Sequence, residues 1–269
     1  MKISVVTPTF NSEKTIAGNI QSIISQAYKD FEHIIIDNLS TDKTIELAKN
    51  YYLSAGMIDR LIIISEKDNG ISDAFNKGIK TASGEIIAIL NSDDVYFNNR
   101  VFEKVAALFE DKEILFVHGD IYFDDDVYGS NIRKPLLCPV TTAMPYNHPS
   151  MFLRREVYER FGFYDASYKY AMDYEFIIRI EKALPGFSKK GKYYSEQPLA
   201  IMNSGGASWI NEFKSIEESK RALKKYGFWN LSARENYLLR VFRTQLKKYF
   251  SLLNLNKLVK YWRNKKWGN

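Results

Sequence analysis

The chain has 269 residues, of which 45% are hydrophobic and 26% charged, and its formal net charge is +6. That length fits one large domain with an appendage or two small domains, and it is long enough to bury a sizeable core. A single cysteine, Cys138, excludes an internal disulfide framework and is typical of a reducing compartment.

Other protein classes are also excluded. Three histidines and one cysteine cannot build a structural zinc site of the Cys/His type. The stretch before Pro8 is too short for the apolar core of a signal peptide, so we expect a cytoplasmic protein. No segment reaches the roughly 18 apolar residues of a membrane-spanning helix.

The positive charge lies in the C-terminal segment. Residues 231–269 hold ten Lys and Arg residues and one acid, Glu235, so this segment carries more than the whole net charge. Charge alone leaves two partners open for it, a nucleic acid and an anionic membrane surface.

The first half of the chain alternates between strand and helix patterns. Strands are predicted over 3–10, 31–37, 60–65, 85–91 and 114–123. Helices are predicted over 13–27, 42–54, 72–81 and 98–109. This order predicts an α/β fold with a largely parallel sheet and right-handed crossovers.

The second half is less regular. Residues 124–150 contain four prolines and are expected to hold at most one or two short strands. Asp124–Asp126 are interpreted as a solvated loop. Helices are predicted over 155–161 and 173–183, and a strand near 193–202. From 210 onward the pattern is helical, with a stop near Tyr226 and Gly227.

The predicted strand at 85–91 ends in two adjacent carboxylates, Asp93 and Asp94. Ligands of open α/β sheets bind beyond the carboxyl ends of such strands. A divalent cation that bridges a phosphate would neutralise the pair, because magnesium and manganese favour carboxylate and phosphate oxygens. The alternative is a solvated Ser-Asp-Asp turn that caps the next helix.

Polar residues follow the other strands at the same edge. They lie in Pro8–Asn11 with Glu13, in Asp37–Asp42 and in Glu66–Gly70. Ser40 or Thr41 also fits a simple helix N-cap. The chain has neither a GxGxxG pattern after its first strand nor a P-loop. These features favour a nucleoside diphosphate linked to a leaving group.

At this point the motifs resemble those of family 2 glycosyltransferases of the inverting, metal-dependent kind. The matching segments cover roughly residues 1–208 and are 6–11, 36–44, 68–78, 82–85, 91–94, 148–152 and 172–176. The resemblance implies a GT-A fold with one catalytic domain over 1–208 and a basic, helical segment over 209–269.

The resemblance also assigns roles to individual residues. The donor nucleotide would be bound by Pro8, Thr9, Glu13, Asp37, Asn38, Asp68, Asp73, Asn76 and Asp93. The metal would be held by Asp94, and Mn²⁺ or Mg²⁺ is the implied cofactor. Asp173 would be the catalytic base, with Glu175 as the alternative. His148, Gly205 and Gly206 are candidates for contact with phosphate or acceptor, although a structural role remains open for each.

The implied reaction is inverting transfer of a sugar from a nucleotide-diphosphate sugar, with UDP as the expected nucleotide. The acceptor would be a hydroxyl of a glycan or lipid-linked saccharide in bacterial surface-polysaccharide assembly. The alternative is a nucleotide-sugar-binding or nucleotidyltransferase-like protein without glycosyl transfer. No nucleic-acid partner is expected.

Within 231–269, apolar residues recur at spacings of three and four: Leu238, Phe242, Leu246, Tyr249 and Leu253. Basic residues lie between them. This pattern is typical of an amphipathic helix at an anionic membrane surface, which would make the protein peripheral to the inner face of the cell membrane. The alternative is a helix packed on the catalytic domain with a solvated basic face.

Overall fold

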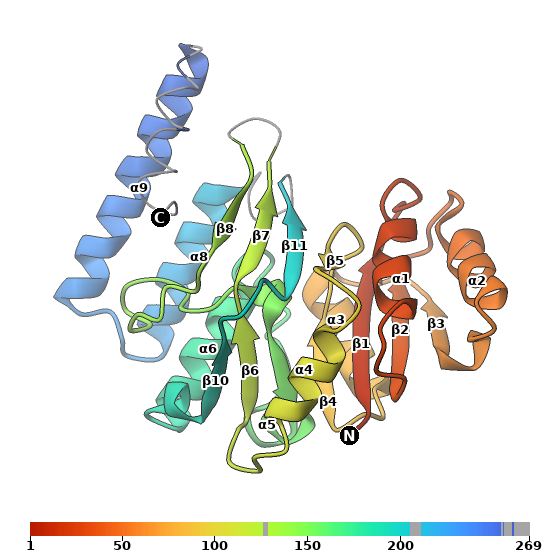
Figure 1. Ribbon diagram of the computed structural model, residues 1–269. Helices are drawn as coiled ribbons and strands as arrows, with labels where there is room; N and C mark the ends of the chain where they lie inside the picture. Colours follow the sequence, from red (N-terminus) through yellow and green to blue (C-terminus); the bar gives the residue numbers. More distant parts are fainter. Residues whose placement is uncertain (126–128, 205–210, 254, 256–259, 261–269) are drawn as a thin grey trace.

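A seven-stranded sheet forms the centre of the computed structural model (Figure 1). The structure describes residues 1–125, 129–204, 211–253, 255 and 260. In spatial order the strands are β10 (Gly191–Tyr194), β6 (Phe116–Gly119), β9 (Phe152–Arg154), β4 (Ile86–Ile89), β1 (Ile3–Thr9), β2 (Phe31–Asp37) and β3 (Leu61–Ser65).

The sheet is mostly parallel, as the alternating sequence pattern predicts. β1 pairs in parallel with β2 and β4, and β2 pairs in parallel with β3. The register sets Thr9 opposite Asp37, and Asp37 opposite Ser65, so the polar residues at these strand ends lie side by side. β9 alone runs antiparallel to its neighbours, β4 and β6.

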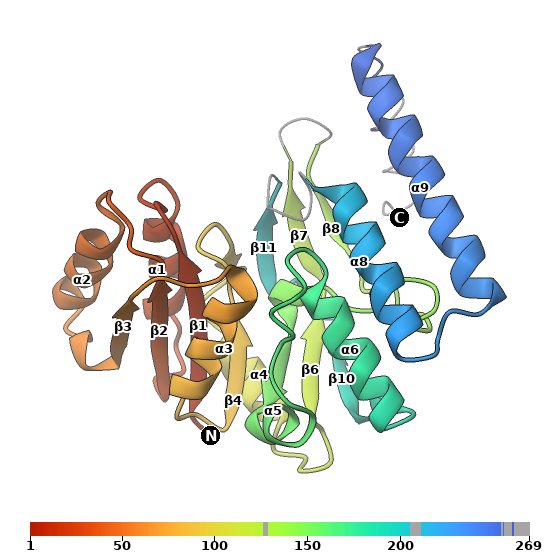
Figure 2. The same cartoon turned by 180° about the vertical axis from the view of Figure 1, so that it is seen from behind.

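Helices cover both faces of this sheet. α1 (Ile16–Ile24), α2 (Thr44–Ser54) and α4 (Val101–Leu108) pack on one face, and α3 (Ile71–Thr81) and α6 (Met172–Ala183) on the other (Figures 1 and 2). α5 (Arg155–Phe161) follows β9 directly. Three 3₁₀ turns span Ile58–Arg60, His148–Ser150 and Phe187–Lys190. Apolar residues of the strands fill the core between these layers.

A second sheet of four short strands extends the molecule beyond the carboxyl end of β6. Its order is β5 (Val95–Tyr96), β11 (Ala200–Asn203), β7 (Ile121–Asp124) and β8 (Asn131–Arg133). β8 is the short strand expected within 124–150. β5 and β11 connect this sheet to the segment after β4, because β5 follows Asp94 directly.

Two of the predicted strands are each divided in the structure. The segment 114–123 becomes β6 and β7, which belong to different sheets, and the segment 193–202 becomes β10 and β11. The first division occurs at Asp120, whose buried carboxylate accepts a hydrogen bond from the Tyr193 hydroxyl at 2.6 Å. The backbone carbonyl of Asp120 also accepts the Leu199 amide at 2.9 Å. Both bonds join the two places where the chain changes sheet.

The C-terminal part is helical, as the sequence predicts. α8 (Glu212–Lys225) packs on α6, and α9 (Leu231–Leu252) packs on α8 (Figure 2). Between them the chain turns at Gly227, whose φ of 78° favours glycine. The proposed domain boundary at residue 208 lies outside the described residues. Within the described part of the chain, no helix combines the length and apolar character needed to span a membrane.

Candidate functional site

A cleft of about 720 Å³ opens beyond the carboxyl ends of β1, β2 and β4. It is where the sequence places the ligand, at the edge where the polar residues of several strands meet. Eight of the predicted site residues line it: Pro8, Thr9, Asn38, Asp68, Asp93, Asp94, His148 and Asp173.

The acidic pair sits in a tight turn between β4 and β5. The Asp94 amide donates to the Asn91 carbonyl at 3.0 Å. Asn19, on α1, donates from its side chain to the carbonyls of Asn91 and Asp94 at 2.9 and 3.0 Å. Asn203, on β11, donates to the Asp93 carbonyl. Two other elements therefore fix the backbone that carries both carboxylates.

Both carboxyl groups are in an environment that disfavours negative charge. Only 2% of Asp94 is exposed. Burial, followed by the neighbouring charge of Asp93, raises the pKa of Asp94 well above its ordinary value. Burial also raises the pKa of Asp93. The Asp94 carboxylate receives a side-chain hydrogen bond from Asn91 at 3.3 Å. A cation at this place would stabilise the ionised form of both groups.

The residues present fit a divalent cation. Besides the two carboxylates, the buried side-chain oxygen of Asn91 has no hydrogen-bond partner in the described structure. No group of three or more His, Cys, Asp or Glu residues in the described part of the chain is arranged to hold a metal. The protein would thus supply few ligands. Mg²⁺ in particular is usually bound by one or two carboxylates together with substrate phosphates.

On the other side of the cleft, hydrogen bonds join the last residues of β1 to the segments that follow β2 and β3. The Asn38 amide donates to the Thr9 carbonyl at 2.9 Å. The Asn38 side-chain oxygen accepts the Asp68 amide, also at 2.9 Å. Asp68 in turn accepts the amide of Gly70, at 2.8 Å, where α3 begins. Pro8, Thr9, Asn38 and Asp68 therefore form one continuous wall.

Four other predicted donor residues do not appear among the described residues that line the cleft. Asp37 is completely buried and accepts hydrogen bonds from Thr9 Oγ1 at 2.9 Å and Ser65 Oγ at 2.7 Å. It therefore joins the ends of β1, β2 and β3. Asp37 also accepts the Ser40 amide at 3.0 Å, which holds the loop after β2.

The other three brace loops at the rim. Glu13 accepts the Lys43 amide at 3.1 Å, and Asp73 accepts the Asn69 amide at 3.0 Å. Asn76 exchanges two hydrogen bonds with the backbone of Tyr164, at 2.8 and 2.9 Å. Gly205 and Gly206 lie outside the described residues.

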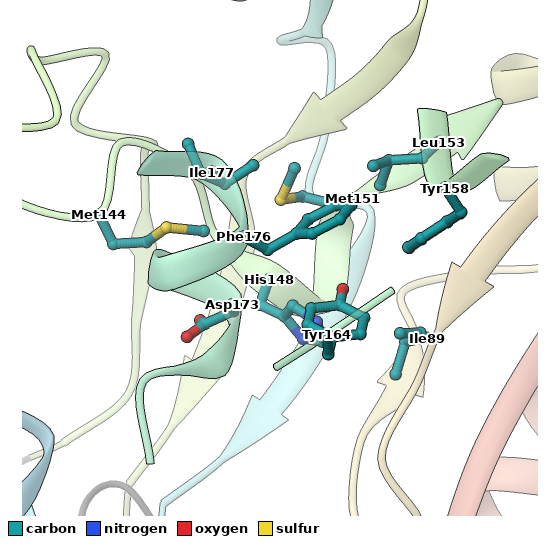
Figure 3. A pocket seen from close by; sticks show the side chains of 10 residues that line it. All are labelled: Ile89, Met144, His148, Met151, Leu153, Tyr158, Tyr164, Asp173, Phe176 and Ile177. Carbon is teal, nitrogen blue, oxygen red and sulfur yellow. The ribbon is translucent and has the colours of Figure 1, made fainter. Parts of the chain in front are cut away.

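Asp173 enters the cleft from α6, where it is the second residue of the helix. One of its carboxylate oxygens accepts the Tyr174 amide at 2.8 Å. The positive end of the helix dipole favours a negative charge at this place. Figure 3 shows Asp173 at the edge of a small apolar pocket, close to His148 and Tyr164.

His148 packs between aromatic rings. Its ring stacks on Phe75, with centroids 5.7 Å apart, and meets the ring of Tyr164 at 6.5 Å (Figure 3). Burial lowers the pKa of His148, and the charge of Asp173 opposes that shift. The imidazole of His148 therefore lines the cleft as a buried, packed ring that lies near Asp173.

Glu175, the alternative base, is completely buried and is not among the described residues that line the cleft. It pairs with Arg179 at 3.2 Å and accepts a hydrogen bond from the Tyr226 hydroxyl. Tyr226 follows α8 directly, so Glu175 ties α6 to α8.

Several residues that line the cleft are not among those predicted from the sequence. Phe10 is 60% exposed there, and Lys14, Lys169 and Tyr170 also line it. Only their position in the sequence could have indicated these residues. Phe10 belongs to the motif at the end of the first strand, and Lys169 and Tyr170 come just before Asp173. No such position indicated Asn203, because this residue directly follows the segment 193–202, which the sequence pattern predicts as one strand.

Comparisons with known proteins agree with this arrangement. A family model described as glycosyl transferase family 2 matches residues 4–175. The putative glycosyltransferase EpsE of Bacillus subtilis (strain 168) is 33% identical over 162 residues, which cover 58% of this chain and 58% of that protein. An uncharacterized glycosyltransferase of Methanocaldococcus jannaschii, MJ1057, is 28% identical over 98% of this chain and 80% of its own length.

Solved structures share the fold. The S. aureus TarS 1–349 structure in complex with UDP-GlcNAc has a TM-score of 0.69, with 19% identity over 94% of this chain and 76% of that chain. The mannosyltransferase PcManGT from Pyrobaculum calidifontis, in complex with GDP-Man and Mn²⁺, has a TM-score of 0.65, with 15% identity over 97% and 82% of the two chains. These likenesses show a GT-A fold.

Proposed function

Since this chain belongs to glycosyl transferase family 2, we propose that it is an inverting glycosyltransferase that uses a nucleotide-diphosphate sugar, with UDP as the nucleotide. The observation that carries this proposal is the shared cleft. It holds the acidic pair Asp93 and Asp94 together with Asp173, a carboxylate on a separate element. The acceptor is a hydroxyl group of a glycan or lipid-linked saccharide, as in surface-polysaccharide assembly.

Asp173 is the proposed general base. As the acceptor oxygen attacks the anomeric carbon, Asp173 takes the proton of the hydroxyl group, and the bond from that carbon to the nucleoside diphosphate breaks. A single displacement inverts the anomeric centre and needs no second carboxylate as a nucleophile. The position of Asp173 in the first turn of α6 suits this task, because the side chain enters the cleft from an element separate from the acidic pair.

The donor is proposed to lie between the two walls of the cleft. Pro8, Thr9, Asn38 and Asp68 would face the nucleoside, and Asp93 the ribose or the sugar. Asp94 would hold Mn²⁺ or Mg²⁺, which neutralises the charge that develops on the leaving diphosphate. The fit of the buried acidic pair to a cation supports this assignment.

A donor screen tests the proposal. We expect one sugar nucleotide, supplied with Mn²⁺ and a saccharide acceptor, to release its nucleotide faster than the others. A product with the opposite anomeric configuration would support inversion, which nuclear magnetic resonance of the product would detect. Tight binding of a sugar nucleotide without transfer to any acceptor would instead favour the binding protein, and incorporation of a nucleoside triphosphate would favour a nucleotidyltransferase.

We also propose that α9 binds an anionic membrane surface. The helix packs on α8 through small and polar side chains, since Ala233 and Thr244 are its buried residues and Thr244 Oγ1 donates to Glu212 at 3.0 Å. Several large apolar side chains of α9 remain exposed to solvent. Leu238, Phe242 and Tyr249 are 64%, 59% and 57% exposed.

The sequence left two alternatives for this helix, a membrane surface and packing on the domain. The helix packs on α8, and its exposed side carries large apolar side chains together with polar and charged ones. In Figure 1 it stands at the edge of the molecule, with α8 between it and the central sheet. Arg234 and Arg243 are exposed on α9 and would complement anionic head groups. A peripheral location at the inner face of the membrane would bring the cleft near a lipid-linked acceptor.

A further inference from the structure

Glu218, on α8, binds the backbone that leads into α6. One of its carboxylate oxygens accepts hydrogen bonds from the amides of Lys169, Tyr170 and Ala171, at distances of 3.1, 2.8 and 3.0 Å. The other oxygen accepts the Lys169 amide at 3.0 Å. Successive amides that converge in this way form an anion-binding nest. Glu218 lies beyond residues 4–175, the part that the family model matches.

The start of α6 is a place where such an anion is stabilising, because the first amides of a helix lack partners within the helix. The residue before the helix is Ala171, whose side chain has no oxygen and makes no cap. The first amides of a helix have no partner within the helix, and an acidic group near them stabilises the helix end. Glu218 supplies this group from another helix, so the start of α6 depends on the docking of α8.

Other residues on the same face of α8 hold the same segment. Ser215 donates to the Tyr170 carbonyl at 3.3 Å, and Arg221 donates to the Ser167 carbonyl at 2.7 Å. Lys225 pairs with Asp165 at 2.9 Å. Together with Glu218, these residues recur every three or four positions, as one face of a helix requires. Residues 165–171 are therefore held along their length by α8.

This segment carries part of the cleft. Lys169, Tyr170, Met172 and Asp173 all line it, and Asp173 comes two residues after the last amide that Glu218 binds. Glu218 itself is not among the described residues that line the cleft. Any displacement of the Ala171 amide moves the first turn of α6 and the carboxylate of Asp173 with it.

We propose that Glu218 is a positioning residue, which fixes the start of α6 and thereby the place of Asp173 relative to the acceptor hydroxyl. This inference rests on the proposed function, in which Asp173 is the base. Displacement of a catalytic group by about 1 Å can lower a rate by roughly 10²-fold. We expect Glu218 to affect donor binding little, because the acidic pair and the wall around Asn38, which are proposed to bind the donor, lie on other elements.

The test compares Glu218→Gln with Glu217→Gln in the full-length protein. Both changes neutralise a glutamate of α8, but Glu217 bonds to Lys220 and to Tyr237 of α9 instead. Glutamine keeps the size of the side chain. Its NH₂ group, however, is a hydrogen-bond donor, and in place of one carboxylate oxygen it would face backbone amides that are also donors. Three properties are measured: kcat, UDP affinity by calorimetry, and hydrogen exchange of residues 165–175.

For Glu218→Gln we expect faster exchange in 165–175, a kcat lower by about 10-fold or more, and UDP affinity within about twofold of the unmodified protein. Glu217→Gln should change none of these. Unchanged exchange would refute the contact itself, whatever the activity. Faster exchange with an unchanged kcat, or an equal loss of UDP affinity, would refute the positioning role. If the unmodified protein transfers no sugar at all, the proposed function is wrong. Hydrogen exchange of residues 165–175 then still tests whether Glu218 holds this segment.

Discussion

Asp94 shows how a single residue can favour function over stability. Its carboxylate is almost fully buried next to that of Asp93, and burial raises its pKa. An unpaired buried charge destabilises a fold, so evolution retains such a group where a ligand compensates for it. In this cleft the compensating ligand would be a cation together with a diphosphate.

We therefore expect Asp94→Asn to abolish the metal dependence of UDP binding. In the unmodified protein, UDP should bind at least about 10-fold more tightly with Mn²⁺ than with a chelator, because the cation bridges carboxylate and diphosphate. In Asp94→Asn this difference should be largely lost. Isothermal titration with and without Mn²⁺ measures it. Equal affinity under both conditions in the unmodified protein would contradict the metal assignment.

Asp173→Asn separates the chemical step from donor binding. Asparagine has nearly the same shape but cannot accept the proton, and loss of a general base typically lowers a rate by about 10²–10⁴-fold. UDP affinity should change little, because Asp173 is on α6 and apart from the acidic pair.

A turnover assay and a UDP titration on the same sample measure both effects. Unchanged turnover in Asp173→Asn would show that another group accepts the proton. A parallel loss of UDP binding would instead give Asp173 a role in holding the donor or the metal.

Which of the acids face the ligand could be predicted from the sequence only in part. Asp93, Asp94 and Asp173, which the motifs single out, all line the cleft. They did not distinguish Asp37, whose carboxylate turns inward to bind Thr9 and Ser65. Both types of acid follow a buried strand, and the direction of the side chain depends on contacts with residues far away in the sequence.

At the scale of elements, the long strands were predictable, whereas the short strands β5 and β9 were not. β1 and β2 are seven residues long and almost entirely buried, and a long segment rich in Val, Ile and other strand-forming residues identified each of them. β9 has three residues and leads directly into α5, which leaves too little sequence for any periodicity. The division of 114–123 at Asp120 depends on Tyr193 and Leu199, which no local pattern reveals.

Besides Asp37, the central strands hold a second buried carboxylate, that of Glu32 on β2. Its carboxylate accepts hydrogen bonds from Ser4 of β1 and from the Ser83 amide, both at 2.6 Å, and pairs with Lys2 at 2.5 Å. Burial acts to raise the pKa of Glu32, but these bonds outweigh it and lower the pKa to about 2. The ionised group therefore stabilises the junction of β1, β2 and β4.

We expect Glu32→Gln to lower the free energy of unfolding at pH 7 by about 2 kcal/mol, the usual range for a hydrogen-bonded charge. Because the folded pKa is depressed, the stabilisation is present above the unfolded pKa of about 4.5 and is lost as the pH falls towards 2. Urea unfolding between pH 7 and pH 3 should thus show a shrinking difference between the two proteins. Glu46→Gln, at an exposed site on α2, is the control and should have little effect at any pH.

At the scale of the whole molecule, α9 has its apolar and polar sides arranged in the opposite way to an ordinary surface helix. Such a helix normally turns its apolar stripe towards the core. Here the side towards α8 carries Ala233, Thr244 and Tyr237, and the outward side carries large apolar residues. Exposed large apolar side chains that gather on one helix, such as Leu238, Leu239 and Phe242, fit the proposed interaction site. The basic side chains beside it favour an anionic bilayer over an uncharged partner.

The prediction is that the double variant Leu238→Ser/Phe242→Ser binds vesicles of phosphatidylcholine and phosphatidylserine at least about 10-fold more weakly than the unmodified protein. Both side chains are more than half exposed in the folded protein. Their replacement should therefore lower the apolar area buried in the membrane and change the stability of the fold little. The matched control is Leu53→Ser/Ile58→Ser, which removes two exposed apolar side chains, 57% and 43% exposed, near α2. It should bind vesicles as the unmodified protein does.

Cosedimentation across salt concentrations measures both contributions, since the attraction of the basic side chains to anionic lipid weakens with salt while the apolar contribution remains. Binding should also fall on vesicles of phosphatidylcholine alone. Equal vesicle binding by the two double variants would contradict a membrane role for the outward stripe. If the unmodified protein instead formed dimers in solution that Leu238→Ser/Phe242→Ser dissociates, the stripe would be the interface with a second copy of the chain, and the proposed location at the membrane would have no support.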